Sequence, residues 1–308
     1  MWTEQQNFAI VQTELDEVVK QTFEYDASTP EIATAETGAL FRVINTDHAA
    51  YIREVAMGPG LWKKIGETQS VPTDVPAVAN KQTVIPSTFA DGISLSKQLF
   101  DDNMHETWSW NVKEFAMMAR VSRDQNAFGL FRNYSGSTLT ADGNAWGSTH
   151  SLIGGGTTTN TTTAASLSPT SLQTMIVALR QQPNQKNVIL GFAPKYLVVP
   201  TPLFAHACQI TQSVLVPDSA NNNINVYRGI YGIEVFSSPY LDAVAGGSDT
   251  AYFLLAQFHH IARIVRQGVQ TALRDWMYSD NLTYRYQGNF REEVSVSDYA
   301  GSIINAGL

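Results

Sequence analysis

The most constraining feature of this sequence is its longest stretch without helix breakers, because neither proline nor glycine occurs between Ile93 and Phe128. Asn103, with Glu106 three residues later, is typical of a helix start, since the amide side chain can accept from a free backbone N–H. We therefore predict one helix over about residues 103–132, roughly 40 Å long. One apolar face of this helix consists of Met104, Trp108, Val112, Phe115 and Ala119. A second stripe, which predicts partners on another side, consists of Trp110, Met117, Val121 and Phe128.

The chain before this helix is mostly irregular. Residues 5–20 carry apolar residues at helical spacing and predict one amphipathic helix. Residues 21–50 have no clear period and predict an extended arm that lies on another part of the structure. Residues 51–97 hold repeated prolines between short strand-like pieces, such as residues 51–57 and 93–99. So long an excursion is uncommon in a compact domain unless it serves a function.

The middle of the chain mixes loops, helices and strands. The polar stretch DGNAWGSTH (142–150) is followed by GGGTTTNTTT (154–163), a low-complexity tract that we predict to be a mobile loop. LSPTSLQTMIVALRQQ predicts a helix that Ser168 caps and that has Pro169 in its first turn. VILGF (188–192) and YLVVP (196–200) predict short buried strands, and TPLFAHACQITQS (201–213) predicts another helix.

Towards the end of the chain, strands dominate. YGIEVF and AYFLLA predict two strands, and Leu282, Tyr284 and Tyr286 alternate with polar residues in a third. Gly288-Asn289 predicts a turn into a further strand that carries Val294 and Val296. Because helices and strands mix without a regular repeat, an α+β fold is favoured over a doubly wound sheet.

Charge and cysteine content exclude several classes of protein. The formal net charge is −8, and no run of like charges indicates a nucleic-acid arm or a basic membrane patch. A single cysteine excludes an intrachain disulfide. The sequence shows neither a secretory signal nor an apolar stretch near the ~18 residues of a membrane span. Only 16% of residues are charged, against roughly 25% in an ordinary soluble domain, which suits a surface used for contacts between subunits.

No catalytic, cofactor or metal site is predicted. His206 and Cys208 are two residues apart on a predicted helix and point to different sides, so we interpret Cys208 as a small buried hydrophobe. Asp142 and His150 could form a catalytic pair, but no candidate nucleophile stands beside them. A structural turn is therefore the favoured interpretation.

The remaining polar clusters have simple explanations. His259-His260 and His150 lack metal-ligand spacing. Gly154-Gly155-Gly156 does not follow a strand and lacks the lysine of a phosphate-binding loop, so we interpret it as a flexible loop. The acidic pairs Asp101-Asp102 and Glu292-Glu293 are interpreted as helix-cap charge and a solvated strand edge.

The order of these elements resembles the tailed-bacteriophage major capsid protein family, with its Hong Kong ninety-seven-type fold. DGNAWGSTH looks like the short Asp-to-His turn after the long helix in many of these proteins, and the stretches from LSPTSLQTMIVALRQQ through PKYLVVPTPLFAHACQI and GIEVFSSPYLD to AYFLLA follow the family's order. The resemblance covers nearly the whole chain. It implies an α+β fold with an N-terminal arm (1–50), an extended loop over a neighbouring subunit (51–97), a peripheral domain with the spine helix (98–166), an axial domain (167–262) and a return to the peripheral domain (263–308).

The resemblance also implies a function. We expect a structural, non-enzymatic major capsid protein that assembles into pentamers and hexamers of an icosahedral shell around phage double-stranded DNA, with no cofactor, no membrane and no sequence-specific DNA contact. The expected location is the virion capsid, after assembly in the host cytoplasm. A separate scaffold, a portal and a decoration protein are the expected partners. Because no scaffolding segment fits before the extended loop, we expect either a separate scaffold or a start close to the mature end, and Met1 favours an unprocessed start.

By the same resemblance, the extended loop supplies the candidate contacts between subunits. These candidates are Leu61, Trp62, Lys63, Lys64 and Lys81. Trp62 and its apolar neighbours would anchor the loop on the next subunit, while the ammonium groups meet acidic residues there. Some family members link a loop lysine covalently to a neighbouring asparagine, but we predict a noncovalent shell. Two alternatives stay open: a nanocompartment shell of the same fold, and a cytosolic hydrolase that uses Cys208.

Overall fold

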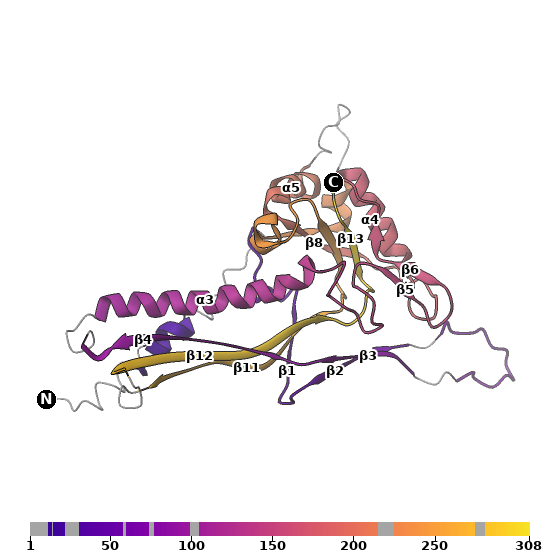
Figure 1. Cartoon of the computed structure of the whole chain (residues 1–308). Helices are drawn as coiled ribbons and strands as arrows, with labels where there is room; N and C mark the ends of the chain where they lie inside the picture. Colours follow the sequence, from indigo (N-terminus) through magenta and orange to yellow (C-terminus); the bar gives the residue numbers. More distant parts are fainter. Residues whose placement is uncertain are drawn as a thin grey trace.

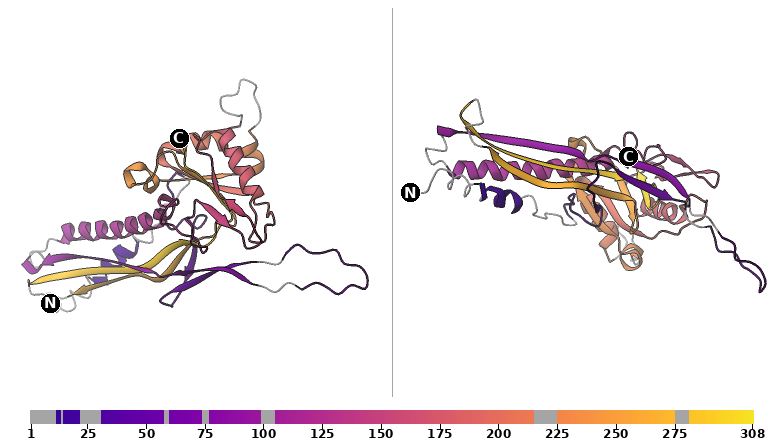
Figure 2. Two further views of the ribbon diagram at one scale, coloured as in Figure 1. Left: turned by 45° about the vertical axis from the view of Figure 1, so that its right-hand side comes forward. Right: turned by 90° about the horizontal axis from the view of Figure 1, so that it is seen from below.

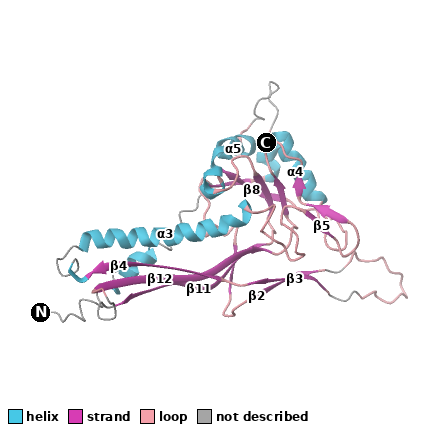
Figure 3. Ribbon diagram, in the orientation of Figure 1, coloured by secondary structure: helices cyan, strands magenta, loops and turns pink. Residues whose placement is uncertain are grey.

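The computed structural model describes residues 12–13, 15–21, 31–57, 60–73, 77–98, 105–214, 225–274 and 281–308. Three parts meet at one junction (Figure 1). A long helix over a long sheet extends to one side, a compact lobe rises beside it, and a hairpin points away to the opposite side. The same three parts are distinct in two further views (Figure 2) and in the view coloured by secondary structure (Figure 3).

The long helix exists as predicted, over the residues that the structure describes. Helix α3 (His105–Arg132) lies along a four-stranded sheet of order β1-β11-β12-β4. The strands of this sheet are β1 (Arg42–Asn45), β4 (Ser87–Ser96), β11 (Ile261–Arg274) and β12 (Thr283–Val296). Val112 and Phe115 face the sheet, where the Phe115 ring meets the Tyr286 ring edge to face with centroids 6.0 Å apart. The predicted helix start at Asn103 lies outside the described residues.

The turn predicted at Gly288-Asn289 is wrong. Both residues lie inside the continuous strand β12, where Gly288 pairs with Thr271 on one side and Asp91 on the other. A Cβ atom on Gly288 would lie 3.1 Å from Cζ of Phe115. Glycine therefore allows the close approach of α3 to the sheet at this point rather than a reversal of the chain.

The N-terminal segment packs against both the helix and the sheet. Residues 15–21 are helical, and Leu15 and Val19 are buried in the same apolar cluster as Phe115 and Tyr286. Farther along, Leu40 and Phe41 are fully buried against the C-terminal part of α3, and β1 then joins the edge of the sheet in parallel with β11. The described part of this segment thus runs over α3 and the sheet as an arm, and these apolar side chains are buried in their cores.

The compact lobe is built on a five-stranded sheet of order β7-β13-β10-β8-β9. Its strands are β7 (Thr161–Thr162), β8 (Pro194–Pro200), β9 (Glu234–Ser238), β10 (Tyr252–Ala256) and β13 (Ser302–Asn305). Helices α4 (Pro169–Gln181) and α5 (Phe204–Gln212) cover one face, where they pack on Leu197 and Leu254. The end of α3 covers the other face, where Phe131 meets Phe253. Successive residues of β8 and β10 therefore enter two different cores.

Two further predictions for the lobe are wrong. The tract at residues 154–163 is not structureless, because β5 (Thr149–Ser151) pairs with β6 (Thr157–Thr159), and β7 pairs with β13. Its glycines form the turn of the β5–β6 hairpin, with φ of +92° at Gly155 and +89° at Gly156. Threonine is β-branched and favours strands. The prediction of a mobile loop considered only the low complexity of the tract and not this preference. VILGF forms no strand, and Ile189 is exposed at an isolated bridge to Pro183.

Three strands pack outside the domain that the sequence predicts for them. Residues 161–162, expected in the peripheral domain, form β7 and pair with β13 in the lobe. Residues 87–96, which the sequence places in the extended loop, form β4 and pair with β12 along its length. Residues 302–305, expected in the return to the peripheral domain, form β13 and pair with β10 inside the lobe. Strands β2 (Tyr51–Ala56) and β3 (Val78–Val84) form a hairpin and pair only with each other among the described strands.

Candidate functional site

The loop of the hairpin carries an apolar side chain far from every core of its own subunit. In Figure 1 the described residues between β2 and β3 project beyond the body of the molecule. Trp62 is 97% exposed and Leu61 is 73% exposed. Lys63 and Lys64 beside them are also exposed. Four of the five predicted contact residues therefore lie together on this loop, without shelter from their own chain.

Lys81, the fifth predicted contact residue, lies apart from the other four. It is on β3, where its Nζ atom pairs with Oε1 of Glu54 on β2 at 2.8 Å. Both side chains are more than two-fifths exposed, so this pair ties the hairpin together but adds little stability.

The base of the hairpin is held to the body by polar contacts that the sequence analysis missed. Arg53 Nη1 donates to the Ser295 carbonyl at 2.8 Å and to Ser295 Oγ at 3.0 Å, and Arg53 Nη2 donates to the His260 carbonyl at 2.7 Å. Gln82 Nε2 donates to the Leu139 carbonyl at 2.9 Å. The one available sequence signal is alternation, since Arg53 shares a strand face with the buried Val55.

Helix α3 presents a second apolar surface that its own subunit leaves open. Of the second predicted stripe, Phe128 is fully buried, whereas Trp110 and Met117 are exposed. Lys113 Nζ lies 5.5 Å from the centroid of the Trp110 ring, a cation–π contact. We expected the helix to have partners on more than one side. Within the subunit, the second stripe is covered only near the C-terminal end of the helix, at Phe128.

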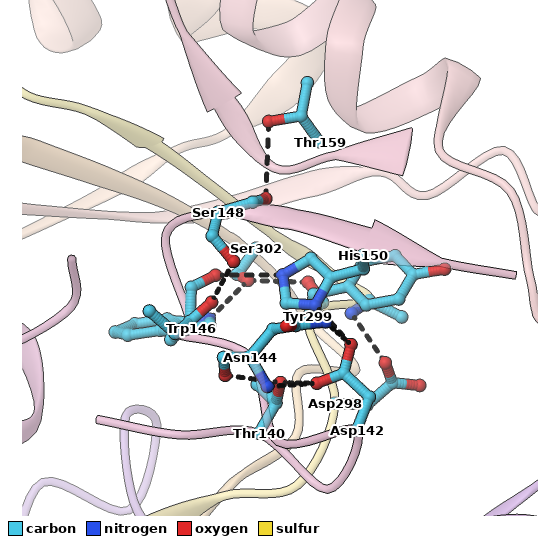
Figure 4. A network of polar contacts seen from close by, with 12 residues as sticks. Thr140, Asp142, Asn144, Trp146, Ser148, His150, Thr159, Asp298, Tyr299 and Ser302 are labelled. Carbon is cyan, nitrogen blue, oxygen red and sulfur yellow. Dashed lines mark hydrogen bonds and ion pairs between the residues drawn. The ribbon is translucent and has the colours of Figure 1, made fainter. Parts of the chain in front are cut away.

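The DGNAWGSTH turn forms a buried polar network (Figure 4). Asp142 accepts from the backbone N–H of Asn144 at 3.1 Å and lies 2.8 Å from His150 Nδ1. The Thr140 hydroxyl also donates to this carboxylate. Although burial opposes ionisation, the hydrogen bonds from His150, Thr140 and Asn144 lower the pKa of Asp142 well below its usual value. Asp142 is therefore a charged turn residue that organises the loop after α3.

The same network excludes His150 from acting as a base towards a nucleophile. One ring nitrogen faces Asp142, and the other, Nε2, lies 3.2 Å from the Trp146 carbonyl. The ring is fully buried and stacks on Tyr299 with centroids 4.5 Å apart. A catalytic triad needs the second nitrogen to face a hydroxyl or thiol. The pair is structural, as the sequence analysis favoured.

The turn also contacts strands β6 and β13 of the lobe. Trp146 is fully buried, and its Nε1 donates to Ser302 Oγ on β13 at 2.9 Å. The Thr159 hydroxyl on β6 reaches the Ser148 carbonyl at 3.4 Å. The network therefore ties the loop after α3 to the last strand of the chain.

His206 and Cys208 do not meet. Strand β8 and helix α5 form as predicted, with the short 3₁₀ turn Thr201–Leu203 between them. His206 Nε2 contacts the Leu167 carbonyl at 2.9 Å. Cys208 is half-buried against the lobe core, and burial raises the pKa of its thiol, which disfavours the reactive thiolate. This supports the interpretation of Cys208 as a packing residue.

The remaining titratable candidates are structural as well. His259 Nε2 lies 2.9 Å from the Ala39 carbonyl, and burial lowers the pKa of both His259 and His260. The prediction of a solvated edge is wrong for Glu292, which is 4% exposed. Glu292 lies near Arg263 of β11 and Arg123 of α3. The alternation pattern of a single strand could not predict these neighbours, because they come from other elements. Asp101-Asp102 lies outside the described residues.

The described part of the chain offers no group of histidine, cysteine or acidic side chains that could hold a metal ion. Among the helices described, none has the length and apolarity needed to cross a membrane.

Comparison with known proteins gives one family and a shared fold. A family model for phage capsid protein matches residues 80–305. The virus-like particle from Pyrococcus furiosus is 7% identical, with coverage of 95% of this chain and 98% of that chain and a TM-score of 0.57. The capsid of Cyanophage P-SCSP1u is 10% identical, with coverage of 92% and 91% and a TM-score of 0.58. The capsid of Myoviridae phage XM1 is 11% identical, with coverage of 93% and 95% and a TM-score of 0.55. No curated protein matches the sequence.

Proposed function

The chain belongs to the phage capsid protein family and is a structural major capsid protein, and from this premise we propose that its copies assemble into pentamers and hexamers of an icosahedral shell around phage double-stranded DNA. The α+β capsid fold expected from the sequence is confirmed. The virion capsid is the location of such a protein. We further propose that assembly takes place in the host cytoplasm, with a separate scaffold, a portal and a decoration protein as partners.

The domain assignment is part of this proposal. The hairpin and the residues between its strands serve as the extended loop, and α3 with the long sheet serves as the peripheral domain. The lobe of α4, α5 and the five-stranded sheet serves as the axial domain, and residues 1–50 serve as the arm, which contributes β1 to the edge of the long sheet. Compared with the boundaries drawn from the sequence, this assignment moves β4 into the peripheral domain, and β7 and β13 into the axial domain.

The observation that carries assembly is the exposure of Trp62 in the loop of a hairpin that projects from its own subunit. A tryptophan buries about 150–250 Å² when it is covered, which is worth roughly 4–6 kcal/mol before entropic costs. Trp62 cannot be buried against the core of its own subunit, because the hairpin loop points away from the body of the molecule (Figure 2). A neighbouring copy is the partner that repetition in a shell supplies.

A structural rather than enzymatic role agrees with the site. Both nitrogens of His150 face partners inside the turn, His206 Nε2 contacts the Leu167 carbonyl, and burial raises the pKa of the Cys208 thiol, so these residues do not favour the hydrolase alternative. The nanocompartment alternative shares the fold, but the family match to phage capsid protein favours a viral shell. A net charge of −8 fits packaging of DNA without sequence-specific contacts, because phosphate binding depends mainly on lysine and arginine.

Shortening the hairpin tests the role of the loop. Met57 N–H donates to the Ala77 carbonyl at 2.9 Å, so a short glycine linker can replace residues 58–76 without strain. We expect this variant to fold, as judged by circular dichroism, and to lose shell formation in light scattering. Trp62→Ala should weaken assembly and Trp62→Phe should largely retain it. Global unfolding of the shortened chain, or normal shells from it, would contradict the assignment of the loop.

A further inference from the structure

The direction of the hairpin is not set by sheet hydrogen bonds. Among the described strands, β2 and β3 pair with each other and with no strand of the two larger sheets. Val55 and Val84 are buried at the base, but apolar burial has little directional preference. Besides the short covalent connection from β3 to β4, polar side chains at the base are therefore the directional contacts that can fix the angle at which the hairpin leaves the subunit.

Arg53 makes contacts that can fix this angle. Its guanidinium donates to Ser295 on β12 and to the carbonyl of His260, which directly precedes β11. The guanidinium is a planar fork with fixed donor directions, so three hydrogen bonds to two strand ends define its orientation. The acceptors are two carbonyls and a hydroxyl, so this contact is directional hydrogen bonding. Burial lowers the pKa of Arg53 to about 10, which leaves it charged at neutral pH.

Gln82 supplies a second contact at the same level of the hairpin. Arg53 and Gln82 are direct partners across the two strands. Gln82 reaches the Leu139 carbonyl, in the loop that follows α3. The next pair outwards, Glu54 and Lys81, closes within the hairpin and does not reach the body. One pair of residues therefore connects both strands of the hairpin to β12, to the start of β11 and to the loop after α3.

From this arrangement we propose that the Arg53–Gln82 pair sets the direction of the extended loop, with Arg53 as a positioning residue for assembly. This inference rests on the proposed function in one respect, namely that the loop contacts a neighbouring copy. The two hydrogen-bonded strands move as a unit about this pair. When the pair is intact, the hairpin holds the loop at one angle. The loop then loses less conformational entropy when it binds the neighbouring copy.

Distance measurements between two spin labels test the proposal. In a Cys208→Ala background, labels at Ser70→Cys on the loop and Gln173→Cys on α4 report the position of the hairpin relative to the lobe. Both positions are exposed. Doubly labelled subunits are diluted with excess unlabelled protein, so that only distances within one subunit are measured. Melting temperature and shell yield are measured on the same samples.

We expect one narrow distance distribution with Arg53 present. Arg53→Met should broaden or shift it, and Arg53→Lys should do so less, since lysine keeps the charge but not the fork. Gln82→Met should have a smaller effect because it removes one hydrogen bond. Lys81→Met is the matched control, because its contact lies within the hairpin, and it should leave the distribution unchanged. Shell yield should fall in the order of the broadening while melting temperatures stay similar.

The outcomes separate this inference from the proposed function. An unchanged distance distribution in both Arg53→Met and Gln82→Met would overturn the positioning role, even where shells still form. If Arg53→Met does not fold, Arg53→Lys and Gln82→Met carry the same distance test. If wild-type subunits form no shells, the proposed function fails, whereas the distance distributions still decide whether the pair directs the hairpin.

Discussion

Glu36 accepts hydrogen bonds from both terminal nitrogens of Arg263, at 3.0 and 3.1 Å, and joins the N-terminal arm to β11. Arg123 of α3 pairs with the same carboxylate. Oε2 of Glu292, on β12, lies 3.9 Å from Nη1 of Arg263. Two carboxylates thus share two guanidinium groups at the point where the arm, the helix and two long strands meet.

This cluster predicts a pH dependence of subunit stability. Burial raises the pKa of Glu292 to about 7 from a usual value near 4.5, although Arg263 and Arg123 oppose the rise. Between these values the folded state holds a proton that the unfolded state has released, so the contribution of Glu292 to stability falls as pH rises from about 4.5 to about 7. The size of this fall is up to about 3 kcal/mol.

The variant Glu292→Gln isolates this effect, because His259 and His260 have lowered pKa values and act in the opposite direction. Urea unfolding of unassembled subunits should show that the stability of Glu292→Gln relative to wild type increases between pH 5 and pH 8. A difference that stays constant with pH would show that Glu292 does not titrate in this range.

Gly288→Ala should destabilise the subunit by about 1–3 kcal/mol, because the new methyl group would lie 3.1 to 3.2 Å from two atoms of the Phe115 ring. The double variant Gly288→Ala, Phe115→Leu should recover part of this loss, since the two residues are in contact. Urea unfolding measures both. Equal stability of Gly288→Ala and wild type would contradict the close packing of α3 on β12.

Much of the fold follows from sequence periodicity. The spacing of Val112 and Phe115 predicts the long helix, and Ser168 caps α4 as expected, accepting from the Ser171 backbone N–H. These features depend on neighbours within one element, which the sequence shows directly. The loop residues around Trp62 were predicted as contact residues from a family resemblance, and their role stays a prediction.

The failed predictions depend on contacts between distant parts of the chain. Gly288 has the local signature of a turn, but its role is decided by Phe115, far earlier in the sequence. Glu292 has the local signature of a solvated edge, but its burial depends on α3 and the arm. Arg53 was missed because its acceptors are mainly backbone carbonyls, which carry no sequence signal.

Cys208→Ala should leave assembly intact and cost about 1 kcal/mol from the small cavity it creates. The thiol is half-buried in the lobe, and His206 is engaged with the Leu167 carbonyl. Thermal unfolding and particle yield measure the effect. Loss of function with folding preserved would instead point to a chemical role for the thiol.

Mature particles should be held together without covalent links between subunits. Lys81 is paired with Glu54, and Lys63 and Lys64 directly follow Trp62, the apolar contact residue that we propose, so contact with acidic residues of a neighbouring copy would account for them without a covalent link. Boiling purified particles in detergent should release one band near 33.9 kDa. A ladder of oligomers that Lys63→Ala, Lys64→Ala or Lys81→Ala abolishes would reveal a cross-link and identify its lysine.

The mass of the particles formed by purified wild-type protein, with a scaffold supplied where one is needed, tests the central claim most directly. Size-exclusion chromatography with light scattering should show capsomers or closed shells far larger than one chain, and electron microscopy should show a rounded shell. A stable 33.9 kDa monomer under every assembly condition would contradict the account.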